Sequence, residues 1–286
     1  MKHTPGSLRP VSDMEFAGDY DSLSDRERGW IKKSIAQHFQ RLRGGSSFTT
    51  ALRQSFPQGF WVEERVQPRD FALLLFDGRL RSISSLVAAS MIPVAVGIPR
   101  CEVVFRAAGG EVWPRGFLAA LELAGIENVS VQPVESGLEL VRFGSTSQGS
   151  ILSFGQIHRP QDVPAFSERI QAMVLEPEYT LGVWLGDEPQ WDFEGIDFVH
   201  AGAKITFFAP PEKDLPVGRH AVRVTLDAFF EQALDAVCVP QRLANRSLEF
   251  FPRVFCPGQE CLWCWPGIHT SQFLKRAVSW GELGNP

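Results

Sequence analysis

The sequence predicts an α/β fold: a doubly wound parallel sheet with a reduced second α/β region. Two observations carry this prediction. Phe71–Phe76 is a continuous apolar run, which is typical of a strand buried on both faces. After it, strand-like and helix-like segments alternate with short links, and this order favours parallel strands joined by crossover helices.

Each element rests on a local pattern. Ser24 and Glu27 form a capping box that begins a helix, and Gly44-Gly45 ends it. The strands expected in the main sheet are 71–76, 102–106, 128–132 and 151–154, and the helices between them are 84–96, 114–124 and 134–143. Beyond them we expect a helix at 163–173, strands at 181–185, 196–199 and 205–208, and an amphipathic helix at 226–237. The segment 48–70 has no assignable pattern.

These elements divide the chain into four parts. Residues 1–20 mix Pro, Gly, Ser and Asp without periodicity, so we expect a flexible arm. Residues 70–205 are expected to form the doubly wound domain. The second region combines an N-terminal helical part, 21–69, with 206–286, which holds a loop rich in Cys and Trp.

Composition narrows the class of function. The chain has 286 residues, 44% of them hydrophobic, and a net charge of −5, which argues for a globular protein and against nucleic acid or an anionic membrane as partner. The longest apolar stretch, 86–99, is broken by Pro93 and is too short to span a bilayer. Five cysteines are too few for a disulfide framework, and no apolar run follows the N-terminus. We therefore expect a cytoplasmic protein that binds a small molecule.

No common catalytic or nucleotide-binding motif is complete. The Walker loop, Gly-x-Gly-x-x-Gly, Gly-x-Ser-x-Gly and His-Glu-x-x-His are all absent. Gly144–Gly149 is a loop of small residues with two open interpretations, a phosphate-binding loop or a plain turn.

A cysteine-rich segment has the spacing of metal ligands. Cys256, Cys261, Cys264 and His269 could close a tetrahedral zinc site, and three cysteines at this spacing also fit an iron–sulfur loop. The alternative is a set of buried free thiols among tryptophans, because Cys is among the most buried residue types.

Several phrases in a shared order resemble histidinol dehydrogenase, of the aldehyde dehydrogenase group. They are Leu75–Arg79 with Ser84–Ala88, then Ile92–Ile98, Leu118–Ile126, Gly195–Asp197 and Gly267–Arg276. The resemblance implies a Rossmann-like fold and the oxidation of an amino alcohol with NAD. It also implies a zinc ion, a Glu-His pair that handles protons, and a homodimer.

The expected cofactor site lies on two loops. The Asp-Gly-Arg phrase at Gly78 and Arg79 corresponds to a family glycine-rich phrase, and Gly155 and Gln156 correspond to a family Gly-Pro-Gly-Asn loop. Ligands of open α/β sheets bind beyond the carboxyl ends of the strands, so both loops should line the main cleft. Arg79 is the expected phosphate contact, because a guanidinium forms paired charge-assisted hydrogen bonds.

The departures from the family concern catalysis. No Glu-His dipeptide occurs, and a family glutamine that contacts the cofactor falls on Ser136. Gln232 matches the family's glutamine metal ligand, but Asp235 stands where a histidine would be. The family's Ala-Gly-Pro-Ser-Glu loop reads His200–Lys204, without its polar contacts. The residues therefore assign no catalytic group.

Three functions remain open. The first is a histidinol dehydrogenase-like protein that no longer oxidises histidinol and retains weak NAD binding. The second is an NAD-dependent oxidoreductase for another alcohol or aldehyde. The third is a metal-binding module in which the cysteine segment holds zinc or an iron–sulfur cluster.

Overall fold

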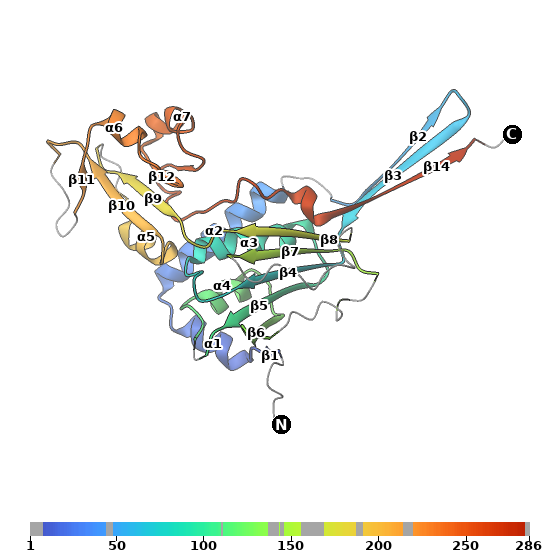
Figure 1. Cartoon of the computed structure of the whole chain (residues 1–286), viewed down its shortest axis with the longest axis horizontal. Helices are drawn as coiled ribbons and strands as arrows, with labels where there is room; N and C mark the ends of the chain where they lie inside the picture. Colours follow the sequence, from blue (N-terminus) through green and yellow to red (C-terminus); the bar gives the residue numbers. More distant parts are fainter. Residues whose placement is uncertain are drawn as a thin grey trace.

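The computed structural model describes residues 8–43, 48–109, 111–136, 143, 146–155, 169–186, 191–213 and 220–283. Figure 1 shows two sheets flanked by helices, and a narrow arm of strands that projects from the body. Among the described helices, none is both long and apolar enough to cross a membrane.

The first sheet has six strands in the order β1-β6-β5-β4-β7-β8. Their bounds are β1 Arg9–Pro10, β4 Phe71–Phe76, β5 Cys101–Ala107, β6 Val129–Pro133, β7 Gly149–Phe154 and β8 Ile170–Leu175. Strands β4 to β8 are parallel, whereas β1 is antiparallel to β6. Because β4 is the first parallel strand and lies in the middle, the strand order reverses between β4 and β7. The predicted α/β fold with a doubly wound parallel sheet is confirmed.

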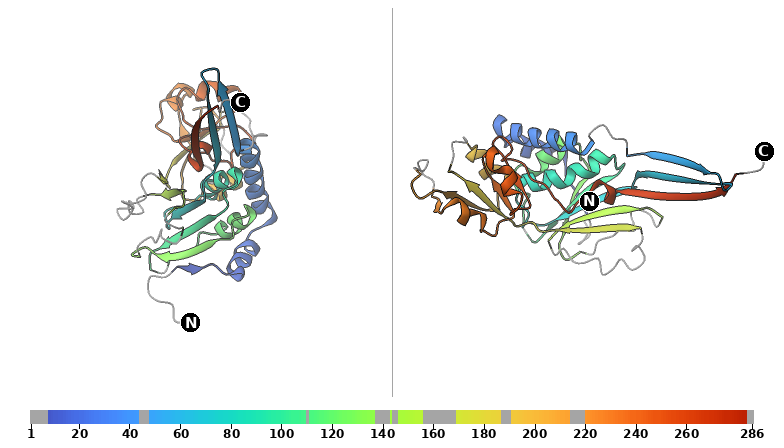
Figure 2. Two further views of the ribbon diagram at one scale, coloured as in Figure 1. Left: turned by 90° about the vertical axis from the view of Figure 1, so that its right-hand side faces the viewer. Right: turned by 90° about the horizontal axis from the view of Figure 1, so that it is seen from above.

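Four helices accompany this sheet, and Figure 2 shows α2 and α3 on the same face of it. Their bounds are α1 Asp13–Asp21, α2 Asp25–Arg43, α3 Ile83–Val96 and α4 Phe117–Leu123. Helix α2 packs on α3, and α1 packs on α4. Every residue of α3 except Val94 is buried, as expected for a helix that is apolar all round.

The second sheet repeats the same topology in smaller form. Its five strands are parallel, in the order β11-β10-β9-β12-β13, so its order reverses between β9 and β12. The bounds are β9 Thr180–Trp184, β10 Lys204–Ala209, β11 Val222–Arg223, β12 Ala236–Cys238 and β13 Val254–Phe255, with helices α5 Phe193–Val199, α6 Leu226–Phe230, η2 Gln241–Leu243 and α7 Ala244–Ser247. Strand β9 and the first two residues of β10 thus belong to the second sheet, although they fall within the range 70–205 expected for the doubly wound domain.

The third sheet is the projecting arm in Figure 1. It is antiparallel, in the order β14-β3-β2, and joins two distant parts of the chain. The bounds are β2 Thr50–Phe56, β3 Phe60–Pro68 and β14 Leu274–Glu282, with η3 Thr270–Phe273 leading into β14. Gly59, with a φ of 89°, supplies the left-handed residue of the three-residue hairpin between β2 and β3.

The expectation of a flexible arm at 1–20 is wrong for the described residues of that range. Strand β1 pairs with β6, and α1 begins at a capping box in which Ser12 and Glu15 exchange hydrogen bonds. Phe16 is buried and anchors the helix to the core. The capping box was present in the sequence, but without apolar periodicity behind it the helix was missed.

Three other expected elements are corrected. Ile170–Met173 lies in strand β8 rather than a helix, and Ile196–Val199 lies in helix α5 rather than a strand. Within the expected helix 226–237, only Leu226–Phe230 is α-helical, as α6, and the last two residues belong to strand β12. Short apolar runs fit either period, so tertiary pairing decides between them. Most of the expected helix 134–143 lies outside the described residues.

Candidate functional site

The loops after β4 and β7 meet where the first sheet reverses its strand order. Asp77-Gly78-Arg79 follows β4, and Gly155 follows β7. Gly155 has a φ of 74°, and a Cβ atom built on it would collide with Nη2 of Arg79. The guanidinium therefore lies directly against the Gly155 backbone, whose positive φ favours glycine. Three of the four expected cofactor residues come together here, while Gln156 lies outside the described residues.

Arg79 is held by its own loop. Its backbone N–H donates to Oδ1 of Asp77 at 3.0 Å, and its Nη2 donates to Oδ2 at 2.8 Å. The hydrogen bond to Asp77 raises the pKa of Arg79 above its usual value. The Arg79 side chain is 45% exposed, so an anion can reach it from solvent. The carboxylate of Asp77 offsets part of the positive charge of Arg79, so Arg79 attracts an anion more weakly than a free arginine would.

A cavity of about 490 Å³, within the usual range of ligand pockets, is lined mainly by residues of α1 and of the segment that follows β5, and by none of Asp77, Gly78, Arg79 and Gly155. Glu111 lines it, and a Cβ atom built on Gly78 would lie 2.5 Å from Oε1 of Glu111. The glycine thus allows this carboxylate to approach the loop after β4. The second oxygen of Glu111 accepts the N–H of Ala108 at 2.9 Å. Glu111 therefore links the Arg79 loop to the cavity.

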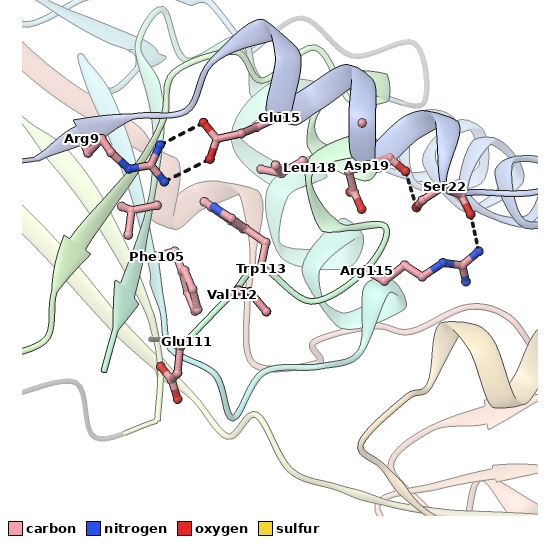
Figure 3. Close-up of a pocket in the computed structure, with 12 residues that line it drawn as sticks. Arg9, Glu15, Asp19, Ser22, Phe105, Glu111, Val112, Trp113, Arg115 and Leu118 are labelled. Atoms are coloured by element: carbon pink, nitrogen blue, oxygen red, sulfur yellow. Dashed lines mark hydrogen bonds and ion pairs between the residues drawn. The ribbon is translucent and has the colours of Figure 1, made fainter. Parts of the chain in front are cut away.

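The cavity has aromatic walls, as Figure 3 shows. The rings of Phe105 in β5 and Trp113 lie 4.9 Å apart between centroids. The Nε1–H of Trp113 is buried without a hydrogen-bond partner among the described residues, and in Figure 3 it points toward the pair Arg9 and Glu15. Val112 at the rim is 82% exposed.

The charged residues around the cavity are paired with one another. Arg9 donates twice to Glu15, at 2.9 and 3.0 Å, and Arg115 donates twice to Glu27, at 2.6 and 2.9 Å. These hydrogen bonds lower the pKa of each glutamate to about 2. Asp19 accepts two backbone N–H groups at the start of α4. The cavity lining holds three carboxylates, Glu15, Asp19 and Glu111, against two guanidinium groups, Arg9 and Arg115, so the rim is net negative and does not select a polyanion.

A buried polar network fixes the start of α3, just beyond the Arg79 loop. The Tyr179 hydroxyl lies 2.8 Å from Oγ of Ser82 and 2.6 Å from Nδ1 of His200. Nε2 of His200 lies 2.8 Å from the Glu260 carbonyl, which can only accept, so Nε2 carries the proton and Nδ1 accepts from Tyr179. Burial lowers the pKa of His200 to about 4 and raises that of Tyr179 to about 12. The network joins the first sheet to the second.

Gln232 and Asp235 do not lie together on a helix, because α6 ends at Phe230. The Asp235 carboxylate accepts the backbone N–H and the hydroxyl of Thr180, at 2.8 and 2.9 Å. The Gln232 amide donates to the carbonyl of Ala228. Both side chains therefore make hydrogen bonds that hold local structure.

The four side chains of the cysteine segment do not gather into one group in the described residues. Among the described residues, no group of three His, Cys, Asp or Glu side chains could hold a metal ion. Cys261 packs in the core with Trp30, and burial raises its pKa to about 12. Burial also raises the pKa of Cys256 and Cys264, whereas His269 is exposed. The burial of Cys261 beside Trp30 fits the interpretation as free thiols in an aromatic cluster.

Two residues of the cavity were missed from the sequence. Glu111 and Trp113 follow β5, so they lie at the same edge of the sheet as Arg79. The rule that ligands bind beyond strand ends could have included this loop. Their convergence also depends on α1, which the sequence did not predict.

The comparisons with known proteins identify the fold. No protein-family model and no curated protein matches the chain. Among solved structures, histidinol dehydrogenase from Elizabethkingia anophelis has 12% sequence identity, and the match covers 95% of this chain and 76% of that chain with a TM-score of 0.54. This similarity shows that the chain shares the fold of that protein.

Two aldehyde dehydrogenase structures match with lower TM-scores. Aldehyde dehydrogenase 21 from Physcomitrella patens has 10% identity, coverage of 95% and 84%, and a TM-score of 0.49. Succinate-semialdehyde dehydrogenase from Burkholderia pseudomallei has 8% identity, coverage of 96% and 80%, and a TM-score of 0.48.

Proposed function

We propose that this protein binds NAD at the carboxyl edge of the first sheet and does not oxidise histidinol. The observation that carries the proposal is the placement of Arg79 against Gly155, at the point where the strand order reverses. Open α/β sheets bind nucleotides at this point, because the loops of adjacent strands diverge there and leave a crevice.

The parts of a dinucleotide match successive parts of the cleft. The diphosphate would lie against Arg79, whose side chain is 45% exposed. Glu111 lies between this loop and the cavity and would accept hydrogen bonds from ribose hydroxyls. The adenine ring would enter the cavity beside Val112 and Trp113, which line it.

We infer the loss of histidinol oxidation from the side chains that would have to bind a metal or transfer a proton. Asp235 binds Thr180 instead of a metal, and His200 is sealed in the network with Tyr179. General acid–base groups typically contribute about 10²–10⁴-fold each, so their loss leaves little turnover.

We place the protein in the cytoplasm, because all five cysteines are free thiols.

Calorimetric titration of NAD tests the proposal. We expect a dissociation constant on the order of 0.1–1 mM, because the Asp77 carboxylate opposes the diphosphate. Arg79→Ala should weaken binding roughly 10- to 100-fold, the usual contribution of hydrogen bonds to charged groups. Arg65→Ala is the matched control, because Arg65 also pairs with an acidic residue two positions away, but on the arm. Absence of heat for wild type, or equal losses in both variants, would contradict the proposal.

A gain in affinity gives a second test. Asp77→Asn keeps an acceptor for the Arg79 backbone but removes the opposing charge, so it should tighten NAD binding by about fivefold, or about 1 kcal/mol. Adenosine monophosphate should compete with NAD, and Glu111→Gln should weaken both. If a panel of alcohols and aldehydes reduces the bound NAD, the protein is an active oxidoreductase with another substrate.

A further inference from the structure

Residues 256–262 lie between two buried aromatic side chains, and we call this segment the strap. Phe255 in β13 precedes it and is 7% exposed, and Trp263 follows it and is 1% exposed. Within the strap, the N–H of Gln259 donates to the carbonyl of Cys256 at 2.8 Å and closes a turn. Because this hydrogen bond is internal, the strap can move as one unit between two fixed ends.

The strap buries a carboxylate that has no counter-ion. Glu260 is 4% exposed, and it forms no ion pair in the part of the chain that the structure describes. Its Oε1 accepts the N–H of Asp192 at 3.2 Å, whereas its Oε2 has no hydrogen-bond partner. A buried charge without a partner is costly, and water satisfies it when the strap moves outward.

Helix α2 holds the strap largely through polar groups that water can replace. Nζ of Lys33, which is exposed, donates to the carbonyl of Gly258 at 2.5 Å. The Gln37 amide donates to Oε1 of Gln259 at 2.8 Å, but its own oxygen is buried without a partner. Such hydrogen bonds contribute little net stability, because both sides bind water when the contact breaks.

The apolar contact between the strap and its neighbours is small. Cys261 packs with Trp30, and Leu262 is only half-buried. The thiol fits closely against α5, since a Cβ atom built on Gly195 would lie 2.7 Å from Sγ of Cys261. A thiol is a small apolar group, so it fastens the strap less firmly than the aromatic rings fasten its two ends.

We propose that the strap opens away from α2 while both sheets stay folded, and that this opening controls access to the Cys261 thiol. Few apolar contacts together with a buried, unpartnered charge are features of a segment that opens locally. In the closed position burial raises the pKa of Cys261 to about 12, so the thiolate that reacts with disulfides is scarce. The open strap places the thiol in water.

Opening also reaches the start of α3. The carbonyl of Glu260 accepts the Nε2–H of His200 at 2.8 Å, and Nδ1 of the same ring lies 2.6 Å from the Tyr179 hydroxyl. That hydroxyl lies 2.8 Å from Oγ of Ser82, the N-cap of α3. An open strap takes the carbonyl away from His200, so access to the thiol is linked to the buried network.

Labelling with dithiobis-nitrobenzoate, an aromatic disulfide, tests the proposal on the full chain. The thiolate of Cys261 attacks the reagent, a mixed disulfide forms, and thionitrobenzoate leaves with the electron pair of the broken S–S bond. Peptide mass spectrometry assigns each labelled cysteine. Cys238 is the internal control, because it is fully buried in β12 and becomes accessible only when the second sheet unfolds.

We expect Cys261 to react at least about 100-fold faster than Cys238. Low concentrations of urea should leave the rate at Cys261 nearly unchanged and raise the rate at Cys238 steeply. The slope differs because strap opening exposes little surface, whereas unfolding of the sheet exposes much.

A variant of the buried carboxylate should close the strap. Glu260→Gln keeps the shape of the side chain and an acceptor for Asp192, and a neutral amide costs less to bury than a carboxylate. It should slow the labelling of Cys261 at least about tenfold. Glu249→Gln is the matched control, because Glu249 is exposed, and it should change the rate less than twofold.

A variant of α5 should open the strap. Gly195→Ala places a Cβ atom against Sγ of Cys261, so it should speed the labelling at least about tenfold. Gly267→Ala is its control, because a Cβ atom there meets nothing within 4 Å. Each rate is divided by that of Cys238 in the same variant, so a general loss of stability cancels.

Three results would overturn the proposal. They are equal rates at Cys261 and Cys238 in wild type, an equally steep urea dependence at both cysteines, and an unchanged ratio of the two rates in Glu260→Gln and Gly195→Ala.

Discussion

Acidification should destabilise the protein through two buried histidines. His200 is fully buried and His38 is 5% exposed, and burial lowers the pKa of each from 6.5 to about 4. In the unfolded chain both take up a proton near pH 6.5. Between pH 6.5 and 4 the unfolded state therefore binds more protons than the folded state. The free energy of unfolding then falls as the pH falls.

The size of this loss follows from the shifts. A pKa of 4 in place of 6.5 costs each histidine about 2.5 kcal/mol between pH 7.5 and 4.5, so the two together cost about 5 kcal/mol. The glutamates with pKa values of about 2, Glu15 and Glu27, lose their contribution mainly below pH 4.5. The range from pH 7.5 to 4.5 therefore reports chiefly on the histidines.

Urea unfolding, monitored by circular dichroism at pH 7.5 and at pH 4.5, measures how much free energy of unfolding is lost between the two pH values. His200→Gln should halve it to about 2.5 kcal/mol, because one titrating group remains. Tyr179→Phe is the control: it removes the hydrogen bond to His200 and should lower stability by about 1–2 kcal/mol at both pH values, with the pH dependence retained. A loss below about 1 kcal/mol in wild type, or an unchanged loss in His200→Gln, would refute the reasoning.

Four further predictions concern stability, metal and turnover. Asp235→Ala should lower the free energy of unfolding by about 1–2 kcal/mol, because the start of β9 loses its carboxylate partner, and the metal content should not change. A Cys261→Ser, Cys264→Ser double variant should contain as much zinc and iron by elemental analysis as wild type; metal lost only in the variant would restore the cysteine site. Gly149→Ala should cost about 3 kcal/mol in thermal or chemical melts, because the new Cβ atom would collide with the ring of Phe71. Histidinol with NAD and zinc should give turnover far below ~1 s⁻¹, and a rate at or above that value would contradict the lost catalysis.

The central sheet was predictable because its signals are local. Phe71–Phe76 is apolar throughout, and Pro and Gly residues mark the ends of the helices that follow, so type and order could be read directly. The second sheet lacks such signals. Strand β12 has three residues and β13 two, and their pairing with distant strands makes them strands.

The strands of the arm were not predicted, for a different reason. Its strands have exposed polar residues on one side and apolar residues on the other, and they join segments about 200 positions apart. The hairpin did carry a sequence signal: three residues ending in Gly59 separate two strand-like runs. Strand β14 carries no comparable signal, because its only pairing partner lies far away in the sequence.

The site was predictable in position but not in detail. Arg79 and Gly155 meet because strand ends of a parallel sheet share an edge, which topology alone requires. The pairing of Arg79 with Asp77 and the approach of Glu111 to Gly78 depend on side-chain positions. No pattern in the sequence encodes them.

The most direct test of NAD binding is the position of the dinucleotide in a crystal structure of the complex. We expect the diphosphate within hydrogen-bond distance of Arg79, about 2.7–3.2 Å, and the adenine ring beside Trp113. A diphosphate bound at the ends of β9 and β12, or adenine outside the cavity, would contradict the proposed site.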